Sequence, residues 1–271
     1  MNAKENNTLI DAACLTPWLR HPAALSSIQW YKQIPSTNLT AKTLGAGSFP
    51  HRGIVLADYQ SAGRGRLGRS FYSPTATGIY LSVLYRPEEN PALPNFVTMA
   101  ACVCTARAIA ACCGKTPAIK WVNDLYLDQR KICGILAEAG TRPGKPGLDY
   151  VIVGIGINLY PPDGGFPKDI QTIAGSVMGN TDPDPDLRLR LIAALIDNLW
   201  ELGSAPSPAG FIADYRDLSM VTGKHITLRG AGGERSGLAA GFTDEGHLIL
   251  QDTDGTRHII SSGEISLIFN D

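Results

Sequence analysis

The change of pattern at Met220 is the feature that most constrains how this chain of 271 residues folds. Before Met220, segments with helical spacing alternate with strand-like runs. After it, every periodic segment is a short strand-like run bounded by Gly-rich or Asp-rich turns. This last part holds about 50 residues, which is near the lower limit for a domain that folds by itself. We therefore expect a larger α+β domain with a small all-β module packed against it.

Apolar periodicity places the elements of both parts. In the larger part, strand-like runs cover residues 28–34, 53–57, 78–85, 118–122, 125–127, 132–139 and 150–158. Helical patterns cover residues 37–44, 95–113 and 187–202, whereas 161–186 is rich in Pro, Gly and Asp and is predicted to be mostly loop. In the small part, the strand-like runs are 225–228, 237–242, 247–251 and 258–261. We predict an irregular or short helical lead-in over 1–28, a mixed β-sheet flanked by helices over 29–219, and a β-barrel-like module over 220–271.

Charge and composition narrow the classes of partner. The chain carries 24 basic and 25 acidic side chains, a net charge of −1, so no overall attraction to nucleic acid or an anionic membrane is expected. The first ten residues lack the basic start and apolar run of a secretory signal, and apolar stretches such as 151–159 are too short to cross a bilayer. The six cysteines have no Cys-x-x-Cys spacing and no paired histidines, which favours reduced thiols over a zinc site. These features predict a cytoplasmic protein.

The segment from Gly63 to Arg69 alternates three arginines with three glycines and follows Gln60. Glycine lets backbone N–H groups approach an anion closely, and arginine offers paired donors to carboxylate or phosphate. A flexible basic surface loop or a nucleic-acid patch would use the same residue types, but no aromatic stripe or basic excess accompanies this one. It also lacks the Gly-Lys-Ser/Thr ending of the common nucleotide-binding loop. The segment therefore favours an anion site of another type, mobile until an anion neutralises its charges.

Two further segments carry candidate polar groups. Asn123 and Asp124 lie side by side between two strand-like runs, where they form either an ordinary turn or an oxygen site for Mg²⁺ beside bound phosphate. Lys131 precedes an apolar run and is either a solvated strand end or a cation directed into a pocket.

Gly154 and Gly156 follow a strand, but the third glycine of a dinucleotide fold is missing. Such glycines indicate the close approach of a ligand or another backbone.

Together these segments resemble biotin protein ligase, over roughly residues 29–271. The resemblance rests on five blocks in the family's order and on the tail Ser262–Leu267: Pro35–Asn38, Gln60 with Gly63–Arg69, Lys120–Asp124, Arg130–Leu136 and Gly154–Asn158. It implies a catalytic domain like that of class II aminoacyl-tRNA synthetases, followed by an SH3-like β-barrel. It also implies a two-step reaction, in which ATP and Mg²⁺ activate biotin as biotinoyl-5′-AMP and the biotinoyl group passes to a lysine of a biotin carboxyl carrier protein, such as an acetyl-CoA carboxylase subunit.

The resemblance also assigns roles to residues. The residues implied to bind biotin are Ser36, Thr37, Asn38, Gln60, Gly63, Arg64, Gly65, Arg66, Lys131, Gly134 and Gly154. The residues implied to bind the nucleotide are Arg64, Arg66, Arg69, Phe71, Asn123 and Asn158. Arg66, Lys131 and Asp124 are implied to be catalytic, with Asp124 as the candidate ligand of Mg²⁺. No tightly bound prosthetic group is implied.

Three departures from the family's pattern affect these expectations. Phe71 stands where the family commonly has Trp, which alters the adenine side, and Val122 stands where Pro is usual. Only about 28 residues precede the expected catalytic domain, roughly half the length of the winged helix-turn-helix of bifunctional members. We therefore expect no DNA binding and no membrane contact. The choice between monomer and homodimer stays open.

Two other functions fit parts of the pattern. A lipoate or octanoyl ligase or transferase has the same general fold, but the arginine-glycine loop and the β-module favour biotin. A non-catalytic biotin sensor that binds the vitamin and DNA is a function of another class, and Lys131, Asp124 and the missing DNA-binding segment count against it.

Overall fold

The computed structural model describes residues 9–142, 144, 146–230 and 233–267. A large mixed sheet forms its centre, in the strand order β1-β2-β3-β4-β8-β7-β6-β5. Its strands are β1 (Leu9–Ile10), β2 (Ile28–Ile34), β3 (Gly53–Gln60), β4 (Gly78–Tyr85), β5 (Ala118–Lys120), β6 (Asp124–Leu127), β7 (Arg130–Gly140) and β8 (Tyr150–Asn158). Only the β2–β3 pair among these strands is parallel, and the connection between those two strands contains helix α1 (Thr37–Gly45).

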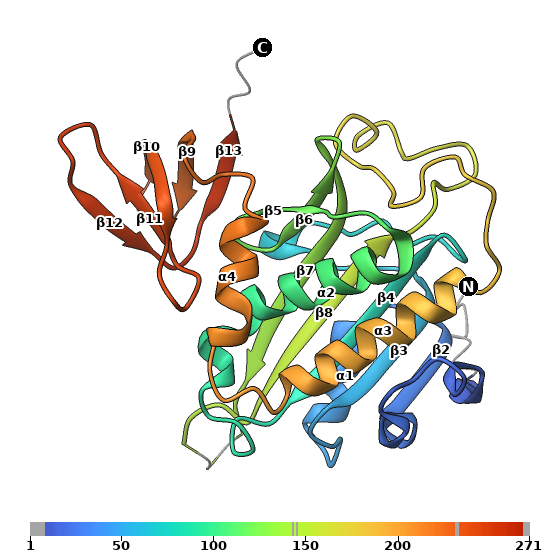
Figure 1. Cartoon of the computed structure of the whole chain (residues 1–271). Coiled ribbons are helices and arrows are strands. Elements are labelled where there is room, and N and C mark those ends of the chain that lie inside the picture. Colours follow the sequence, from blue (N-terminus) through green and yellow to red (C-terminus); the bar gives the residue numbers. More distant parts are fainter. Residues whose placement is uncertain (1–8, 143, 145, 231–232, 268–271) are drawn as a thin grey trace.

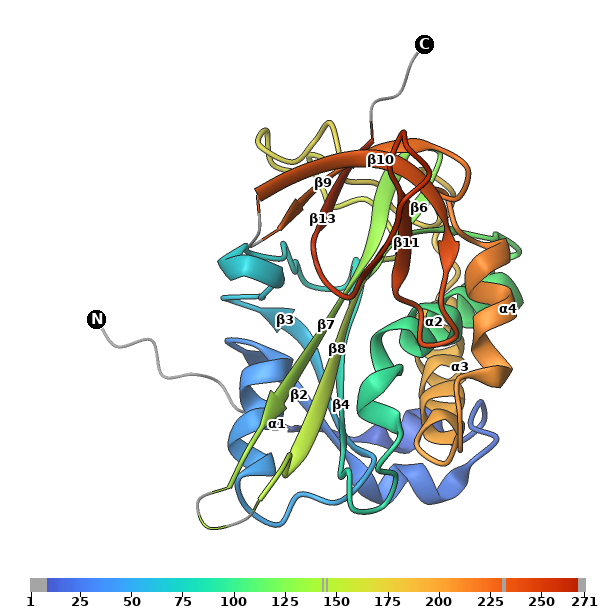
Figure 2. The same ribbon diagram turned by 90° about the vertical axis from the view of Figure 1, so that its left-hand side faces the viewer.

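Helices cover both faces of this sheet, as Figure 2 shows. Helix α1 lies on one face, and α2 (Val97–Cys113), α3 (Leu187–Leu202) and α4 (Ala209–Asp217) lie on the other. Successive side chains of a strand point to opposite faces of the sheet, and here apolar side chains face the helices on both sides. Leu81 and Val83 of β4 belong to the larger core with α2 and α3, whereas Leu84 belongs to a smaller core under α1. The sheet is therefore buried on both faces, and polar residues within it require hydrogen-bond partners.

The C-terminal part folds into a separate antiparallel sheet beside α4 (Figure 1). Its order is β12-β11-β10-β9-β13, with β9 (His225–Gly230), β10 (Gly233–Phe242), β11 (Leu248–Gln251), β12 (Arg257–Ile260) and β13 (Glu264–Leu267). The indole N–H of Trp121 donates to the Gly246 carbonyl over 3.1 Å, and Arg216 donates to the Phe242 carbonyl over 2.9 Å. The small module is thus joined to the larger domain by buried and half-buried polar contacts.

The expected mixed sheet with flanking helices and a C-terminal β-module is confirmed. Helix α4 and strands β1 and β13 were not expected from the sequence. Helix α4 follows a segment rich in Ser and Pro, and β1 and β13 are only two and four residues long. In the lead-in, 3₁₀ helices occupy Ala12–Leu15 and Pro22–Ser27. Of the helices in the described part of the chain, none combines the length and apolar character needed to cross a bilayer.

Candidate active site

A cavity of about 460 Å³ opens between one end of the large sheet and the C-terminal module. Its walls come from the start of α1, the 63–72 loop, the turn before β6, strands β7 and β8, the 166–174 segment, and β9 with the turn before β13. Every site residue expected from the sequence lines this cavity except Gly63. Gly63 instead supports the loop from beneath, because its carbonyl accepts the Phe71 N–H over 2.8 Å.

One end of the cavity is formed by buried polar residues at the start of α1. Ser36 caps the helix, with its hydroxyl accepting the Leu39 N–H over 3.5 Å, and Thr37 and Asn38 form the first turn. These three side chains and Gln60, the last residue of β3, are each no more than 8% exposed. Such groups are stable in this position only when hydrogen-bonded to the protein or to a ligand.

The orientation of the Gln60 carboxamide follows from its partners. The Thr37 backbone N–H can only donate, so the atom 2.8 Å from it is the oxygen Oε1. The nitrogen Nε2 then donates to the Ser73 hydroxyl over 2.8 Å, and that hydroxyl donates in turn to the Phe71 carbonyl over 2.9 Å. These contacts use one hydrogen of the Gln60 amide and leave the second for a ligand.

The orientation of Asn38 is fixed in the same way. Its nitrogen donates to the Leu136 carbonyl over 3.2 Å and to Oε2 of Glu138 over 2.8 Å, and both partners are acceptors. The oxygen Oδ1 therefore faces the Ser82 hydroxyl, 2.6 Å away. Ser82 has one hydrogen and donates it to this oxygen, so the nearby Thr37 hydroxyl, 2.8 Å from Ser82, turns its own hydrogen toward Ser82 or Gln60. Thr37 and Asn38 thus present lone pairs to the cavity.

Two glycines of β8 make room for these contacts. A Cβ at Gly154 would overlap Oδ1 of Asn38. A Cβ at Gly156 would lie 2.5–2.9 Å from three atoms of the Phe71 ring, which also approaches Gly134. The closely spaced glycines therefore serve close approach, as the sequence indicated, and Phe71 packs over this part of the sheet.

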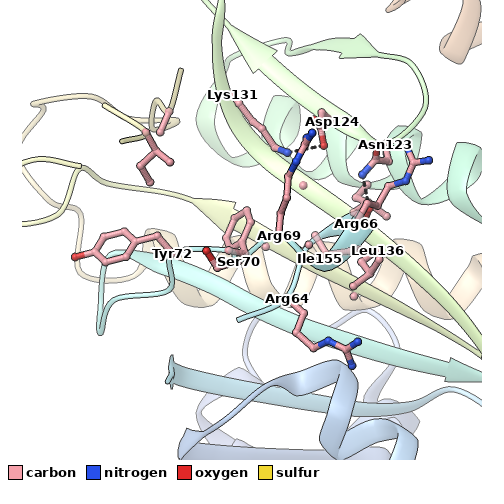
Figure 3. Close-up of a pocket in the computed structure, with 18 of the residues that line it drawn as sticks. Arg64, Arg66, Arg69, Ser70, Tyr72, Asn123, Asp124, Lys131, Leu136 and Ile155 are labelled. Atoms are coloured by element: carbon pink, nitrogen blue, oxygen red, sulfur yellow. Dashed lines mark hydrogen bonds and ion pairs between the residues drawn. The ribbon is translucent and has the colours of Figure 1, made fainter. Parts of the chain in front are cut away.

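The three arginines of the loop contact different parts of the cavity wall. Arg66 donates to Oδ1 of Asn123 and to the Gly263 carbonyl, each over 3.2 Å. Arg69 pairs with Glu264 over 2.7 Å, and Arg64 lies 3.6 Å from Glu138. Arg64 points away from the other two in Figure 3. The loop consequently spans the cavity from β7 to the C-terminal module.

Lys131 and Asp124 face each other across the β6–β7 pair (Figure 3). The Lys131 Nζ lies 2.7 Å from Oδ1 of Asp124, and the two side chains are 31% and 21% exposed. The Lys131 backbone is also bonded on both sides, because its N–H donates to the Ile173 carbonyl and its own carbonyl accepts the Gly175 N–H. The Lys131 ammonium therefore lies at the cavity wall beside Asp124.

Several lining residues had no role in the sequence-based expectations. Lys120 is half-buried, with Nζ 5.7 Å from the centre of the Tyr126 ring, and burial lowers the pKa of its ammonium group. Burial of the Tyr126 phenol, together with the nearby negative charge of Asp124, raises the pKa of Tyr126 to about 12. Arg229 and Glu264 reach the cavity from the C-terminal module, and Phe166 and Ile173 reach it from the 161–186 loop. Lys120 lies in a recognised block and Glu264 in the recognised tail, but neither was given a role, whereas Arg229, Phe166 and Ile173 lie in segments with no local signal.

The comparisons with known proteins agree with this geometry. The model of the Biotin/lipoate A/B protein ligase family matches residues 30–158, and that of the Biotin protein ligase C terminal domain matches residues 221–268. The biotin–[acetyl-CoA-carboxylase] ligase of Paracoccus denitrificans is 34% identical over 240 residues, which cover 85% of this chain and 96% of that protein. The chain belongs to the biotin/lipoate A/B protein ligase family.

Other members of the biotin/lipoate A/B protein ligase family extend this similarity. The bifunctional ligase/repressor BirA of Bacillus spizizenii is 30% identical over 232 residues, covering 84% of this chain and 70% of that protein. A solved structure of biotin protein ligase from Aquifex aeolicus in complex with biotin and ATP superimposes with a TM-score of 0.70 at 26% identity. That superposition covers 88% of this chain and 97% of the Aquifex chain, so it spans the catalytic sheet and the C-terminal module together.

Proposed function

We propose that this protein is an ATP-dependent ligase that activates biotin as biotinoyl-5′-AMP and transfers it to a lysine of a biotin carboxyl carrier protein. One observation carries the proposal, namely the set of unused hydrogen-bonding groups at the buried end of the cavity. Ser36 and Gln60 each retain a hydrogen to donate, and Thr37 and Asn38 retain lone pairs. Two donors and two acceptors complement a cyclic urea, whose carbonyl accepts twice and whose two N–H groups donate.

This polar set separates biotin from the other substrates of the family. The dithiolane of lipoate and the alkyl chain of octanoate have no group that could pair with these four residues. Binding either one would leave buried donors and acceptors unpaired, which is how a site built to bond polar groups rejects analogues that lack them. The named relatives and the Aquifex complex with biotin and ATP support the same choice.

The cations at the other end of the cavity suit the first chemical step. A carboxylate oxygen of biotin attacks the α-phosphorus of ATP, and the bond from that phosphorus to the departing pyrophosphate breaks. Two anions meet in this step, so fixed positive charge stabilises the transition state more than the separate substrates. We assign this role to Arg66 and Lys131, with Asp124 holding the Lys131 ammonium in place. In the second step the neutral amine of the carrier lysine attacks the acyl carbon, and AMP leaves.

The remaining assignments follow the walls of the cavity. Arg64 and Gly65 would lie along the biotin carboxylate, and Arg69, Asn123 and Asn158 would contact the nucleotide. Phe71 would form the surface against which the ligand packs, since it lies over Gly134 and Gly156.

The donor set fits Mg²⁺ carried by ATP. Among the described residues no group of three or more His, Cys, Asp or Glu side chains could hold a metal ion. Mg²⁺ needs only one or two protein carboxylates when phosphates and water complete its ligands. Asp124 would be the protein ligand, and the ion would neutralise charge on the phosphates.

We propose in addition that residues 29–219 form the catalytic domain and residues 220–271 the C-terminal domain. A cytoplasmic location is supported by the reduced state of all six cysteines. The absence of DNA binding stays a prediction.

The test is exchange of labelled pyrophosphate into ATP, measured with biotin, lipoate or octanoate as the acid. We expect exchange with biotin alone, followed by labelling of a biotin carboxyl carrier protein. Exchange with lipoate or octanoate instead would establish a ligase for those acids. Biotin binding without exchange would establish a sensor.

A further inference from the structure

We propose that Ser82 and Glu138 are positioning residues that set the selectivity of the buried end of the cavity. Both lie behind the lining residues and contact Asn38 from opposite sides. Through Asn38 and Thr37 they determine whether the cavity presents acceptors or donors to the ring of the ligand. The inference rests on the proposed function and deepens it, because it names the residues that specify a urea.

Ser82 is a polar residue in the middle of a strand that is buried along its whole length. It is fully buried in β4, where Leu84 on the same face and Val55, opposite Ser82 on β3, belong to the apolar core under α1. Opposite Ser82 in the register of the sheet stands Gly154, whose missing side chain leaves room for Oδ1 of Asn38. A serine and a glycine in register thus create one polar position on an otherwise apolar face, and the Asn38 oxygen occupies it.

The Ser82 hydroxyl fixes two groups with one hydrogen. Because it donates to Asn38, it can only accept from Thr37, and the Thr37 hydrogen is directed away from the cavity. Replacement by alanine would remove the donor that faces Oδ1 of Asn38. It would also leave the Thr37 hydroxyl free to rotate toward the ligand, where its hydrogen would oppose the N–H of a urea.

Glu138 fixes the other end of the Asn38 carboxamide. Its oxygen Oε2 accepts from Asn38 over 2.8 Å, while Oε1 lies 3.6 Å from the Arg64 guanidinium. A carboxylate only accepts, so it disfavours the flipped carboxamide, in which the oxygen would face it. Without Glu138 only the Leu136 carbonyl holds the amide, and the flipped form would present N–H groups to the N–H groups of a urea.

Cyclic carbamate analogues of biotin, in which a ring oxygen replaces one ureido N–H, test this directly. Lone pairs on Asn38 and Thr37 would repel that ring oxygen, so the wild-type protein should prefer biotin strongly. We expect Ser82→Ala and Glu138→Ala to raise the KM for biotin by about tenfold, as the loss of one buried hydrogen bond implies. They should lower the preference for biotin over the carbamates by a similar factor, with the KM for ATP unchanged.

Two further variants separate positioning from stability and from charge. Thr105→Val removes a fully buried hydroxyl that donates within α2, away from the cavity, and should lower the melting temperature without changing the KM or the preference. Glu138→Gln keeps an oxygen that can accept from Asn38 but loses the charge beside Arg64, so it should recover most of the lost preference.

An unchanged preference in Ser82→Ala and Glu138→Ala would overturn the inference. If Glu138→Gln is as impaired as Glu138→Ala, the role assigned to Glu138 is overturned, because the loss of the charge beside Arg64 would then be the cause. Wild-type protein that exchanges pyrophosphate with lipoate rather than biotin would overturn the proposed function itself, a result that the variants cannot imitate.

Discussion

The Nζ of Lys131 lies 2.7 Å from Oδ1 of Asp124, and this pair joins strands β6 and β7 at the wall of the cavity. An ammonium group on a flexible side chain has many positions available to it, and a neighbouring carboxylate selects one. In the proposed reaction, that carboxylate also carries a negative charge close to incoming phosphates. In the proposed reaction Asp124 therefore has two roles, because it positions Lys131 and holds the Mg²⁺ that neutralises those phosphates.

Asp124→Asn should weaken both roles. We expect the maximal rate of biotinoyl-5′-AMP formation to fall by about tenfold or more, because Lys131 loses its charged partner. The KM for ATP should rise as well, since the proposed ligand of Mg²⁺ loses its charge. Asp214→Asn is the matched control, because Asp214 pairs with Arg107 on the exposed surface of α4 and such pairs contribute little. A rate for Asp124→Asn equal to that of the control would contradict the assignment.

Gly154→Ala should impair biotin binding rather than ATP binding. The added Cβ overlaps Oδ1 of Asn38 and would displace the carboxamide from its bonds to Ser82 and Glu138. We expect the KM for biotin to rise by about tenfold or more, since at least one buried hydrogen bond is lost. Gly210→Ala provides the control, because open space surrounds that helical position. Steady-state kinetics with unchanged biotin affinity in Gly154→Ala would refute this.

The buried ammonium group of Lys120 should lower the free energy of unfolding at neutral pH. Burial lowers its folded-state pKa below the ordinary 10.5, so the unfolded chain holds the proton more tightly. The penalty is complete below the folded-state pKa and disappears as the pH rises from there to 10.5. Lys120→Met should therefore be more stable than the wild type at pH 7, with a smaller difference at pH 10. Urea unfolding at both values, with the exposed Lys42→Met as control, measures this, and a difference that grows with pH would be inconsistent with it.

The 63–69 loop should become more ordered when ligands bind. Its backbone closes through the Gly65 N–H to the Arg69 carbonyl and the Phe71 N–H to the Gly63 carbonyl. Three arginines repel one another there until an anion lies between them. Hydrogen exchange of these amides should slow when biotin and ATP are added together. Exchange at the same rate with and without ligands would count against the loop as the anion site.

Much of the fold could be predicted from the sequence because burial imposes a pattern on it. Strands β2, β4 and β8 and helix α3 begin and end where periodicity and turn residues placed them. Helix α4 was missed because Gly, Ser and Pro precede it and only Phe211, Ile212 and Tyr215 of its residues are buried. A helix this short is stabilised by tertiary packing rather than by its own sequence.

The candidate site was also predictable from the sequence only in part. Ser36, Gln60 and Lys131 lie in recognisable blocks, and the structure brings them to one cavity. Glu264 lies in the recognised tail, but its place in the cavity could not be predicted, since its pairing with Arg69 joins residues 195 positions apart. Ser82 had no signal either, because a serine in an apolar strand shows no partner until the register with Gly154 and the position of Asn38 are known.

The most direct test of the central claim is single-turnover formation of biotinoyl-5′-AMP by the wild type and by Lys131→Ala. With saturating biotin and labelled ATP, the wild-type protein should convert one equivalent to the adenylate. Lys131→Ala, checked for an unchanged circular dichroism spectrum, should do so about a hundred- to a thousand-fold more slowly, the usual cost of losing one fixed donor to a developing charge. No adenylate from the wild type, or a variant rate within about threefold of it, would contradict the account.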